Sequence, residues 1–96
     1  MTVLKKYEIM ILLTNEFNEN ELKTWVFNYV RILRKFNVSE ISVISRGKHN
    51  LAYSINKESK GNYIQLNFFS MPKYITTFLN ILKLDYHVLR FLIFNK

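Results

Sequence analysis

The sequence predicts an α+β domain of the ferredoxin-like, split β-α-β type: a four-stranded antiparallel sheet with two helices on one face. Two segments repeat apolar residues at three- and four-residue steps, as amphipathic helices do, and four segments have the apolar runs or alternation of strands. Their order is strand, helix, strand, strand, helix, strand. In this arrangement the first and last strands are neighbours near the centre, and the face without helices is open for docking. With 96 residues, we expect a single domain over residues 1–96.

The first strand and helix have clear local signals. The run Tyr7 to Leu13 is short and rich in Ile and Leu, which suits a central strand covered on at least one face. Asn18 and Glu21 have the spacing of a capping box, so the helix should run from about Glu19 to Phe36. One helix face collects the apolar residues Leu22, Trp25, Val26, Tyr29, Val30, Leu33 and Phe36.

A long hairpin follows the first helix. From Val38 to Ile55 the apolar alternation has a period of two and keeps its parity through Gly47. This predicts one long strand, bent or bulged at the glycine, although two strands broken at Gly47 would also fit. A polar turn over residues 56–62 should lead into a second alternating strand over residues 63–69.

The last two elements are shorter. Pro72 favours a helix start, because proline is well accommodated in the first helical turn. Its apolar stripe is narrow, and Asp85 should end the helix region. Residues 87–94 then read as the last strand, in which Arg90 is the only charge.

The composition indicates a polyanionic partner. The chain has 14 Lys and Arg against 7 Asp and Glu, a formal net charge of +7, and a sequence pI of about 9.8. Such a balance is typical of nucleic-acid binders, although a generic basic surface kept for solubility is the alternative. The absence of Cys excludes disulfides and thiolate metal sites. The apolar runs are too short to span a bilayer, so we expect no membrane partner.

The residues of an enzyme are not assembled in the sequence. Most of the seven acids fall in turns or at helix starts, and His49 and His87 lack metal-ligand spacing. With two glycines there is no phosphate-binding glycine loop. We therefore expect no enzyme activity, no cofactor, no metal and no small-molecule substrate.

Positive residues are more informative, because arginine and lysine bind phosphates and aromatic faces can stack on unpaired bases. The alternative is that the tyrosines are half-buried strand residues and the lysines protect sheet edges. The residues concerned are Lys5 and Lys6 at the start of the first strand, Arg46 and Lys48 in the hairpin and Arg90 in the last strand, interleaved with Tyr7, Tyr53 and Tyr63.

The stretch Gly47 to Ile55 resembles a motif of the bacterial-type ribosomal protein S6 family of the small subunit, which reads Gly, a basic run, then Leu-Ala-Tyr-Pro-Ile or a close variant. The resemblance extends in order over nearly the whole chain. Its other parts are Lys6-Tyr7-Glu8, Lys60-Gly61-Asn62-Tyr63, Met71-Pro72 and the run from Asp85 to Phe91.

This resemblance implies a ferredoxin-like fold and a structural role in the small ribosomal subunit. The family binds the central domain of small-subunit rRNA together with ribosomal protein S18, with which it forms a heterodimer. Judged by their positions in the motifs, the resemblance implies that five residues contact rRNA: Lys5, Lys6, Tyr7, Lys48 and Arg90. We add Arg46 for its place in the hairpin.

Three departures from the family pattern bear on these contacts. His49 and Asn50 replace an Arg-rich pair, which weakens a phosphate contact there, and Ser54 replaces a frequent proline. We expect the C-terminal tail of many members to be nearly absent here. We also expect no signal or transit segment before the first strand, and the residue usage suits an AT-rich genome. These features favour a plastid-encoded protein of the chloroplast stroma, with the cytoplasm of a low-GC bacterium as the alternative.

Two other functions are compatible with this order of elements. A free-standing RNA-recognition module shares the element order, but Asn62 stands where its third-strand signature needs an aromatic residue. A regulatory or acyl-phosphate-cleaving domain also shares the order, but the turn from Thr14 to Asn18 has no Arg and no glycine cradle.

Overall fold

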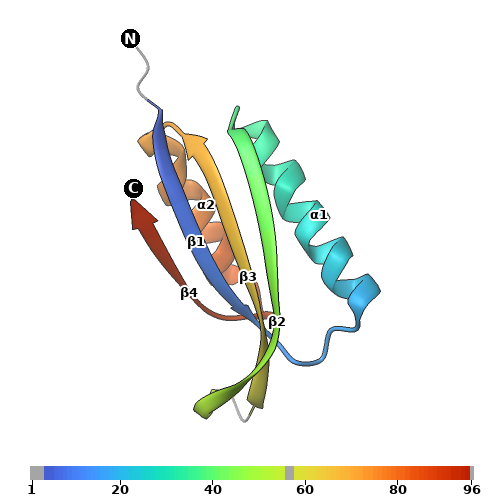
Figure 1. Ribbon diagram of the computed structural model, residues 1–96. Helices are drawn as coiled ribbons and strands as arrows, with labels where there is room; N and C mark the ends of the chain where they lie inside the picture. The colour runs from blue at the N-terminus through green and yellow to red at the C-terminus, as the bar shows by residue number, and fades with distance from the viewer. Residues whose placement is uncertain (1–3, 56–57, 96) are drawn as a thin grey trace.

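The computed structural model describes residues 4–55 and 58–95, with the backbone alone for residues 48–55 and 58–60. The elements follow the predicted order, and their ribbons form one sheet with the helices behind it (Figure 1). They are β1 (Lys5–Leu13), α1 (Glu19–Lys35), β2 (Ser39–Ile55), β3 (Glu58–Ser70), α2 (Pro72–Leu84) and β4 (Val88–Asn95).

The four strands form one antiparallel sheet in the order β2-β3-β1-β4. The first and last strands are neighbours, as predicted, but β4 lies at an edge and the two central strands are β1 and β3. Every residue of β1 pairs with β3, from Lys5 opposite Ser70 to Leu13 opposite Asn62. The β1-α1-β2 crossover passes over the position of β3, and the β3-α2-β4 crossover passes over β1. Strand β1 therefore has β3 on one side and β4 on the other.

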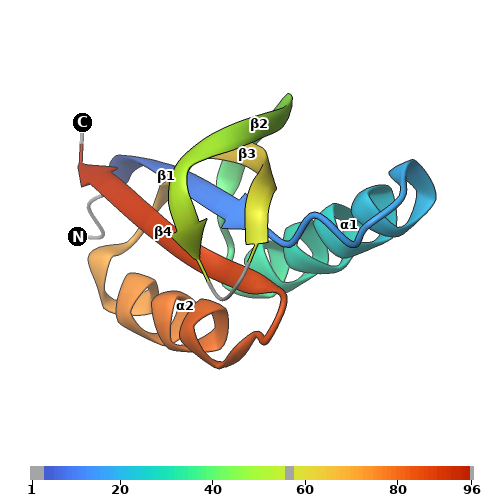
Figure 2. The ribbon, with the colours of Figure 1, turned by 90° about the horizontal axis from the view of Figure 1, so that it is seen from below.

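Both helices lie on the same face of the sheet (Figure 2). Helix α1 begins with the predicted capping box: the Glu21 backbone N–H donates to Asn18 Oδ1 at 2.8 Å, and the Asn18 backbone N–H donates to Glu21 Oε1 at 3.0 Å. These bonds satisfy N–H groups that a helix start leaves without partners. Helix α2 begins at Pro72 and ends before Asp85, also as predicted.

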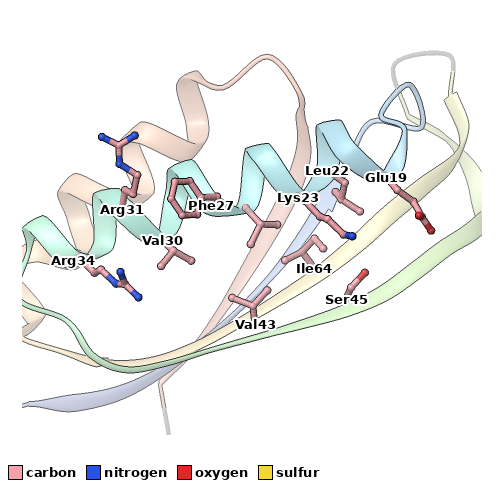
Figure 3. Close-up of a pocket in the computed structure, with 11 residues that line it drawn as sticks. Glu19, Leu22, Lys23, Phe27, Val30, Arg31, Arg34, Val43, Ser45 and Ile64 are labelled. Atoms are coloured by element: carbon pink, nitrogen blue, oxygen red, sulfur yellow. The ribbon is translucent and has the colours of Figure 1, made fainter.

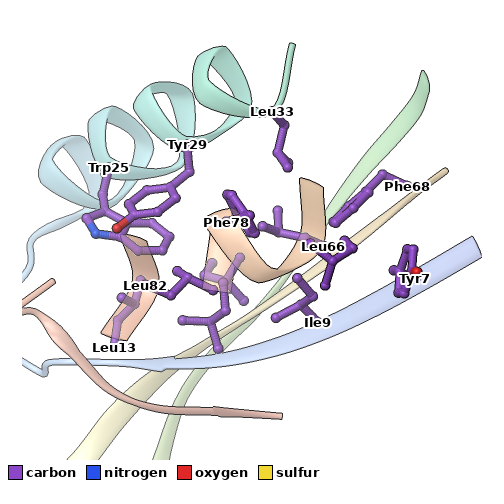
Figure 4. Close-up of a cluster of buried hydrophobic side chains, with 13 residues drawn as sticks. Tyr7, Ile9, Leu13, Trp25, Tyr29, Leu33, Leu66, Phe68, Phe78 and Leu82 are labelled. Carbon is purple, nitrogen blue, oxygen red and sulfur yellow. The ribbon is translucent and has the colours of Figure 1, made fainter. Parts of the chain in front are cut away.

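The core lies between the sheet and the two helices (Figure 4). Strands contribute alternate residues to it, because successive side chains of a strand point to opposite faces. Helices contribute the stripes predicted from the sequence. Its buried members are Tyr7, Ile9, Ile11, Leu13, Trp25, Tyr29, Leu33, Ile64, Leu66, Phe68, Ile75, Phe78 and Leu82.

Strand β2 is continuous through Gly47, so the bulged-strand alternative is confirmed. Gly47 has a φ of 76°, in the left-handed region that glycine adopts without strain. The side-chain parity does not continue through the bulge, however. Ser45 lies opposite Ile64, which faces the helices, whereas Gly47 lies opposite Tyr63, which faces away.

The hairpin is longer than predicted. Strand β3 begins at Glu58, so residues 58–62, assigned to a polar turn, pair with β2 instead, while residues 56–57 lie outside the described part. These polar residues could form a strand because the hairpin projects beyond the core and needs no apolar face there (Figure 1). Where the hairpin leaves the core, a Cβ at Gly61 would clash with Leu12 Cδ1 and lie 3.1 Å from the Leu13 carbonyl oxygen, so this close approach favours glycine.

None of the helices in the described part of the chain is long and apolar enough to cross a membrane.

Candidate nucleic-acid interface

The candidate interface is the sheet face that carries no helix, called here the open face. Its side chains alternate along each strand with those of the core, and the pairing of the strands places them in rows across the sheet. The open face consists of Lys6, Glu8, Met10 and Leu12 of β1, Ser42, Ile44 and Arg46 of β2, Tyr63, Gln65, Asn67 and Phe69 of β3, and Arg90, Leu92 and Phe94 of β4.

The two predicted arginines lie at opposite ends of one row. Arg90 on β4 pairs with Leu12, and Leu12 pairs with Tyr63 on β3. Tyr63 pairs in turn with Gly47, the neighbour of Arg46 on β2. Both arginines are exposed. The structure thus brings Arg46 and Arg90 to one end of the open face, with the aromatic side chain of Tyr63 between them. This set of Arg46, Tyr63, Leu12 and Arg90 is called here the arginine row.

Hydrogen bonds position the Arg46 guanidinium. Its Nε donates to Gln65 Oε1 at 3.1 Å, and its Nη2 donates to the same oxygen. The Gln65 Nε2 then donates to Asn67 Oδ1 at 3.2 Å. A planar guanidinium fixed in this way is oriented before any ligand arrives, which favours recognition of phosphate.

Lys6 lies at the other end of the open face. It pairs with Phe69 and stands six positions before Leu12, about 20 Å away at the usual strand rise. The hollow beside it, about 380 Å³ in volume, is also lined by Glu8 and Glu40. Lys5 is exposed but has the parity of the helix side. The charge at this end is therefore mixed, unlike that of the arginine row.

Tyr7 does not belong to the open face. Its side chain is 6% exposed and faces the helices, with its ring centroid 6.1 Å from that of Phe68. Because the ring is enclosed in the core, it has no face on which a base could stack, and we leave Tyr7 out of the proposed contact surface. Lys48 pairs with Asn62 through its backbone, and its side chain lies outside the described residues.

Reasoning from the sequence missed an apolar patch on the open face. Leu92 is 56% exposed and Phe94 is 46% exposed, and Ile44 is 39% exposed on the far edge strand. Met10 pairs with Leu92 and extends the patch toward the centre. The signal was present in the unbroken apolar run from Phe91 to Phe94, which gives β4 apolar side chains on both faces.

Asp85 proves to be a structural clamp at the end of α2. Its Oδ2 accepts hydrogen bonds from Tyr29 Oη at 2.6 Å and Trp25 Nε1 at 2.9 Å, and its Oδ1 accepts one from the His87 backbone N–H at 2.9 Å. Burial raises the pKa of the Tyr29 phenol far above its usual range, and the hydrogen bond and charge of Asp85 add to this effect. These contacts hold α1 against the segment between α2 and β4.

The described residues contain no group of three or more His, Asp or Glu side chains placed to hold a metal ion.

Comparison with known proteins identifies the family. The model of the ribosomal protein S6 family matches residues 6–95. The chain is 73% identical to small ribosomal subunit protein bS6c of Phaeodactylum tricornutum over 96 residues, covering 100% of this chain and 98% of the relative. It is 65% identical to the bS6c of Trieres chinensis over 96 residues, covering 100% of both. A bS6 protein of Trichodesmium erythraeum is 31% identical over 86 residues, covering 90% of this chain and 74% of that protein.

A solved structure agrees with the fold. The crystal structure of 30S ribosomal protein S6 from Thermotoga maritima superposes with a TM-score of 0.89, covers 98% of this chain and 89% of that one, and is 21% identical in sequence. The ferredoxin-like architecture predicted from the sequence is therefore confirmed. With a family match over nearly its whole length, the chain belongs to the ribosomal protein S6 family and has a structural rather than an enzymatic role.

Proposed function

We propose that the chain is a constituent of the small ribosomal subunit that binds the central domain of small-subunit rRNA together with ribosomal protein S18. Membership of the family supports the ribosomal role. The observation that carries the RNA contact is the arginine row, in which Arg46 is held by Gln65 and Arg90 lies across the sheet.

The arginine row suits folded RNA. Two exposed guanidinium groups at opposite ends of one row across the sheet can each meet a phosphate, and the overall charge of +7 attracts a polyanion over a longer range. Tyr63 lies between them and adds an aromatic side chain to the same row. A free-standing RNA-recognition module is disfavoured, because the open-face positions of β1 are Lys6, Glu8, Met10 and Leu12, and none of them is aromatic.

The partner protein is assigned to the apolar patch of the same face. Leu92 and Phe94 remain largely exposed in the single chain, and exposed apolar patches on small proteins commonly mark protein contacts. A net charge of +7 opposes contact with a second copy of the chain. We therefore infer that ribosomal protein S18 covers Leu92 and Phe94, while the arginine row contacts the RNA.

The relatives suggest where the protein works. The bS6c proteins of Phaeodactylum tricornutum and Trieres chinensis are of the plastid type, and they are 73% and 65% identical to this chain. The cyanobacterial relative from Trichodesmium erythraeum is only 31% identical. We infer that this protein acts in the ribosome of a plastid, in the stroma, rather than in a bacterial cytoplasm.

Binding of a central-domain rRNA fragment to the protein mixed with ribosomal protein S18 tests the function. We expect affinity that falls steeply with salt, because each neutralised phosphate releases counterions. The double variant R46Q/R90Q should bind more weakly and should show a salt slope smaller in magnitude by roughly one to two. The matched control K35Q/K83Q removes the same charge from the helices and should change binding much less. Absence of binding even at low salt would contradict the proposal.

A further inference from the structure

A second surface lies on the opposite side of the molecule from the open face, between α1 and the edge strand β2. It is a groove of about 530 Å³ (Figure 3). Val43 and Ile64 point from the strands toward Leu22 and Val30 of the helix. This groove uses none of the arginine row or the apolar patch.

Apolar side chains of the groove remain exposed although the helix packs against the sheet. Phe27 on α1 is 61% exposed and Val43 on β2 is 39% exposed. Both residues line the groove, as do Val26 and Val30. Burying such side chains against a partner removes apolar surface from water at about 25 cal/mol per Å² before the costs of association.

Charges on the groove are predominantly positive. Lys23, Arg31 and Arg34 line it from α1, and Glu19 is the only acid among the lining residues of the described chain. The Arg31 guanidinium lies 6.0 Å from the centroid of the Phe27 ring. Glu19 stands at the N-terminal end of the helix, so the positive charge increases toward Arg34. An occupant should therefore bring negative charge to the Arg34 end and apolar side chains to the middle.

The shape and lining select the class of occupant. From Glu19 to Arg34 the groove follows about 22 Å of helix at the usual rise, which suits a chain segment. Phe27 is the one aromatic side chain among its lining residues in the described chain, and the other apolar ones are aliphatic. Bases stack on aromatic faces, so RNA would gain little by covering Leu22, Val26 or Val43. A second copy of this chain, with its charge of +7, would be repelled.

We propose that the groove between α1 and β2 binds a segment of another protein that combines aliphatic side chains with Asp or Glu. The aliphatic groups lie over Val26, Val30 and Val43, and the acids pair with Lys23 and Arg34. The site is separate from the proposed rRNA and S18 contacts, so it allows the protein to hold a third component.

The test uses the full chain and a labelled synthetic peptide of alternating leucine and glutamate. We expect binding in fluorescence anisotropy, with NMR shift changes concentrated at α1 and the Val43 region of β2. The same peptide with lysine in place of glutamate, and an oligouridine of similar length, should not bind the groove. Shift changes located at Leu92 and Phe94 instead, displacement of the acidic peptide by oligouridine, or no binding of the acidic peptide would overturn the proposal.

A matched pair of variants identifies the charge contact. R34E should weaken the acidic peptide by about tenfold, since the reversed charge faces the acids directly. K35E makes the same charge change in the same last turn of α1, but Lys35 does not line the groove. It also has the same unfavourable effect on the helix dipole. Thermal melting of both variants checks that they fold, and an equal loss of binding in the two would overturn the assigned contact.

Discussion

The two faces of the sheet are built from the same strands but have opposite roles. On the helix side, Ile9 and Leu66 are fully buried against α1 and α2. On the open face, Leu92 and Phe94 are about half exposed, and charged or amide side chains occupy many of the remaining positions. Because neighbouring residues of a strand point to opposite faces, one segment of chain serves both roles.

This difference separates stability from binding. The helix-side residues form one continuous core, so each contributes to the folded state through its neighbours. The exposed apolar residues of the open face, Leu92 and Phe94, bury less surface in the isolated chain, so replacing them should cost less stability. Substitutions on the two faces should therefore have distinct effects, and the following experiments test that separation.

The largest expected effect is for L66A. Leu66 is 0% exposed on a central strand, and its truncation should lower the free energy of unfolding by about 2–5 kcal/mol, from lost burial and the cavity left behind. Chemical denaturation monitored by circular dichroism measures the loss. The matched variant L92A makes the same change on the open face and should shift stability by only about 0.5 kcal/mol. Equal losses would show that the two faces are not distinct in this way.

A somewhat smaller effect is expected for D85A. The variant leaves the buried Trp25 indole N–H and Tyr29 hydroxyl without their acceptor, which should cost about 2 kcal/mol of unfolding free energy. E16A removes an exposed carboxylate and should remain within about 0.5 kcal/mol of the unaltered protein. The comparison uses urea denaturation at neutral pH. Equal stability of the two variants would contradict the clamp at the end of α2.

The same clamp predicts a loss of stability in alkaline solution. The usual pKa of tyrosine is about 10, and the folded state raises that of Tyr29, so the unfolded chain loses this proton first. The contribution is therefore fully present below about pH 10 and decreases as the pH rises above it. Urea midpoints of the unaltered protein should fall more steeply between pH 9 and pH 11 than those of Y29F. Parallel curves would show that Tyr29 does not titrate differently on folding.

The smallest effect on stability is expected for R46Q/R90Q. Both side chains are exposed, and interactions of exposed charged groups contribute little to stability, so the change should remain within about 1 kcal/mol. The same preparation should nevertheless lose affinity for the rRNA fragment. Thermal melting measures the stability and filter binding measures the RNA affinity of the same sample. A large drop in melting temperature would show that the arginines stabilise the fold instead.

The outline of the fold could be predicted because its signals are local. The capping box at Asn18 and Glu21, the apolar stripe of α1 and Pro72 at the start of α2 all depend on residues a few positions apart. The hairpin was less predictable. Polar residues 58–62 read as a turn, yet they pair as a strand because β2 offers them a partner that no local pattern reveals.

The candidate site was predictable only in part. The cationic residues of the strands could be named, but whether they lie together depends on strand register. The bulge at Gly47 and the pairing of Leu12 with both Tyr63 and Arg90 bring Arg46 and Arg90 to one row and leave Lys6 about 20 Å away. Tyr7 shows the same limit of prediction from sequence. Its motif suggested an rRNA contact, whereas its position in the alternation of β1 places its side chain in the core.

The amino-acid sequence by itself determined the element order, the helix ends, the positive charge and the resemblance to the family, because these depend on residue types and short spacings. The tertiary structure decided which side chains share a surface: the arginine row, the apolar patch with Leu92 and Phe94, and the groove between α1 and β2. The physical reason is that a strand's pairing partner and register arise from contacts between segments far apart in the chain, and a shift of one residue moves a side chain to the opposite face.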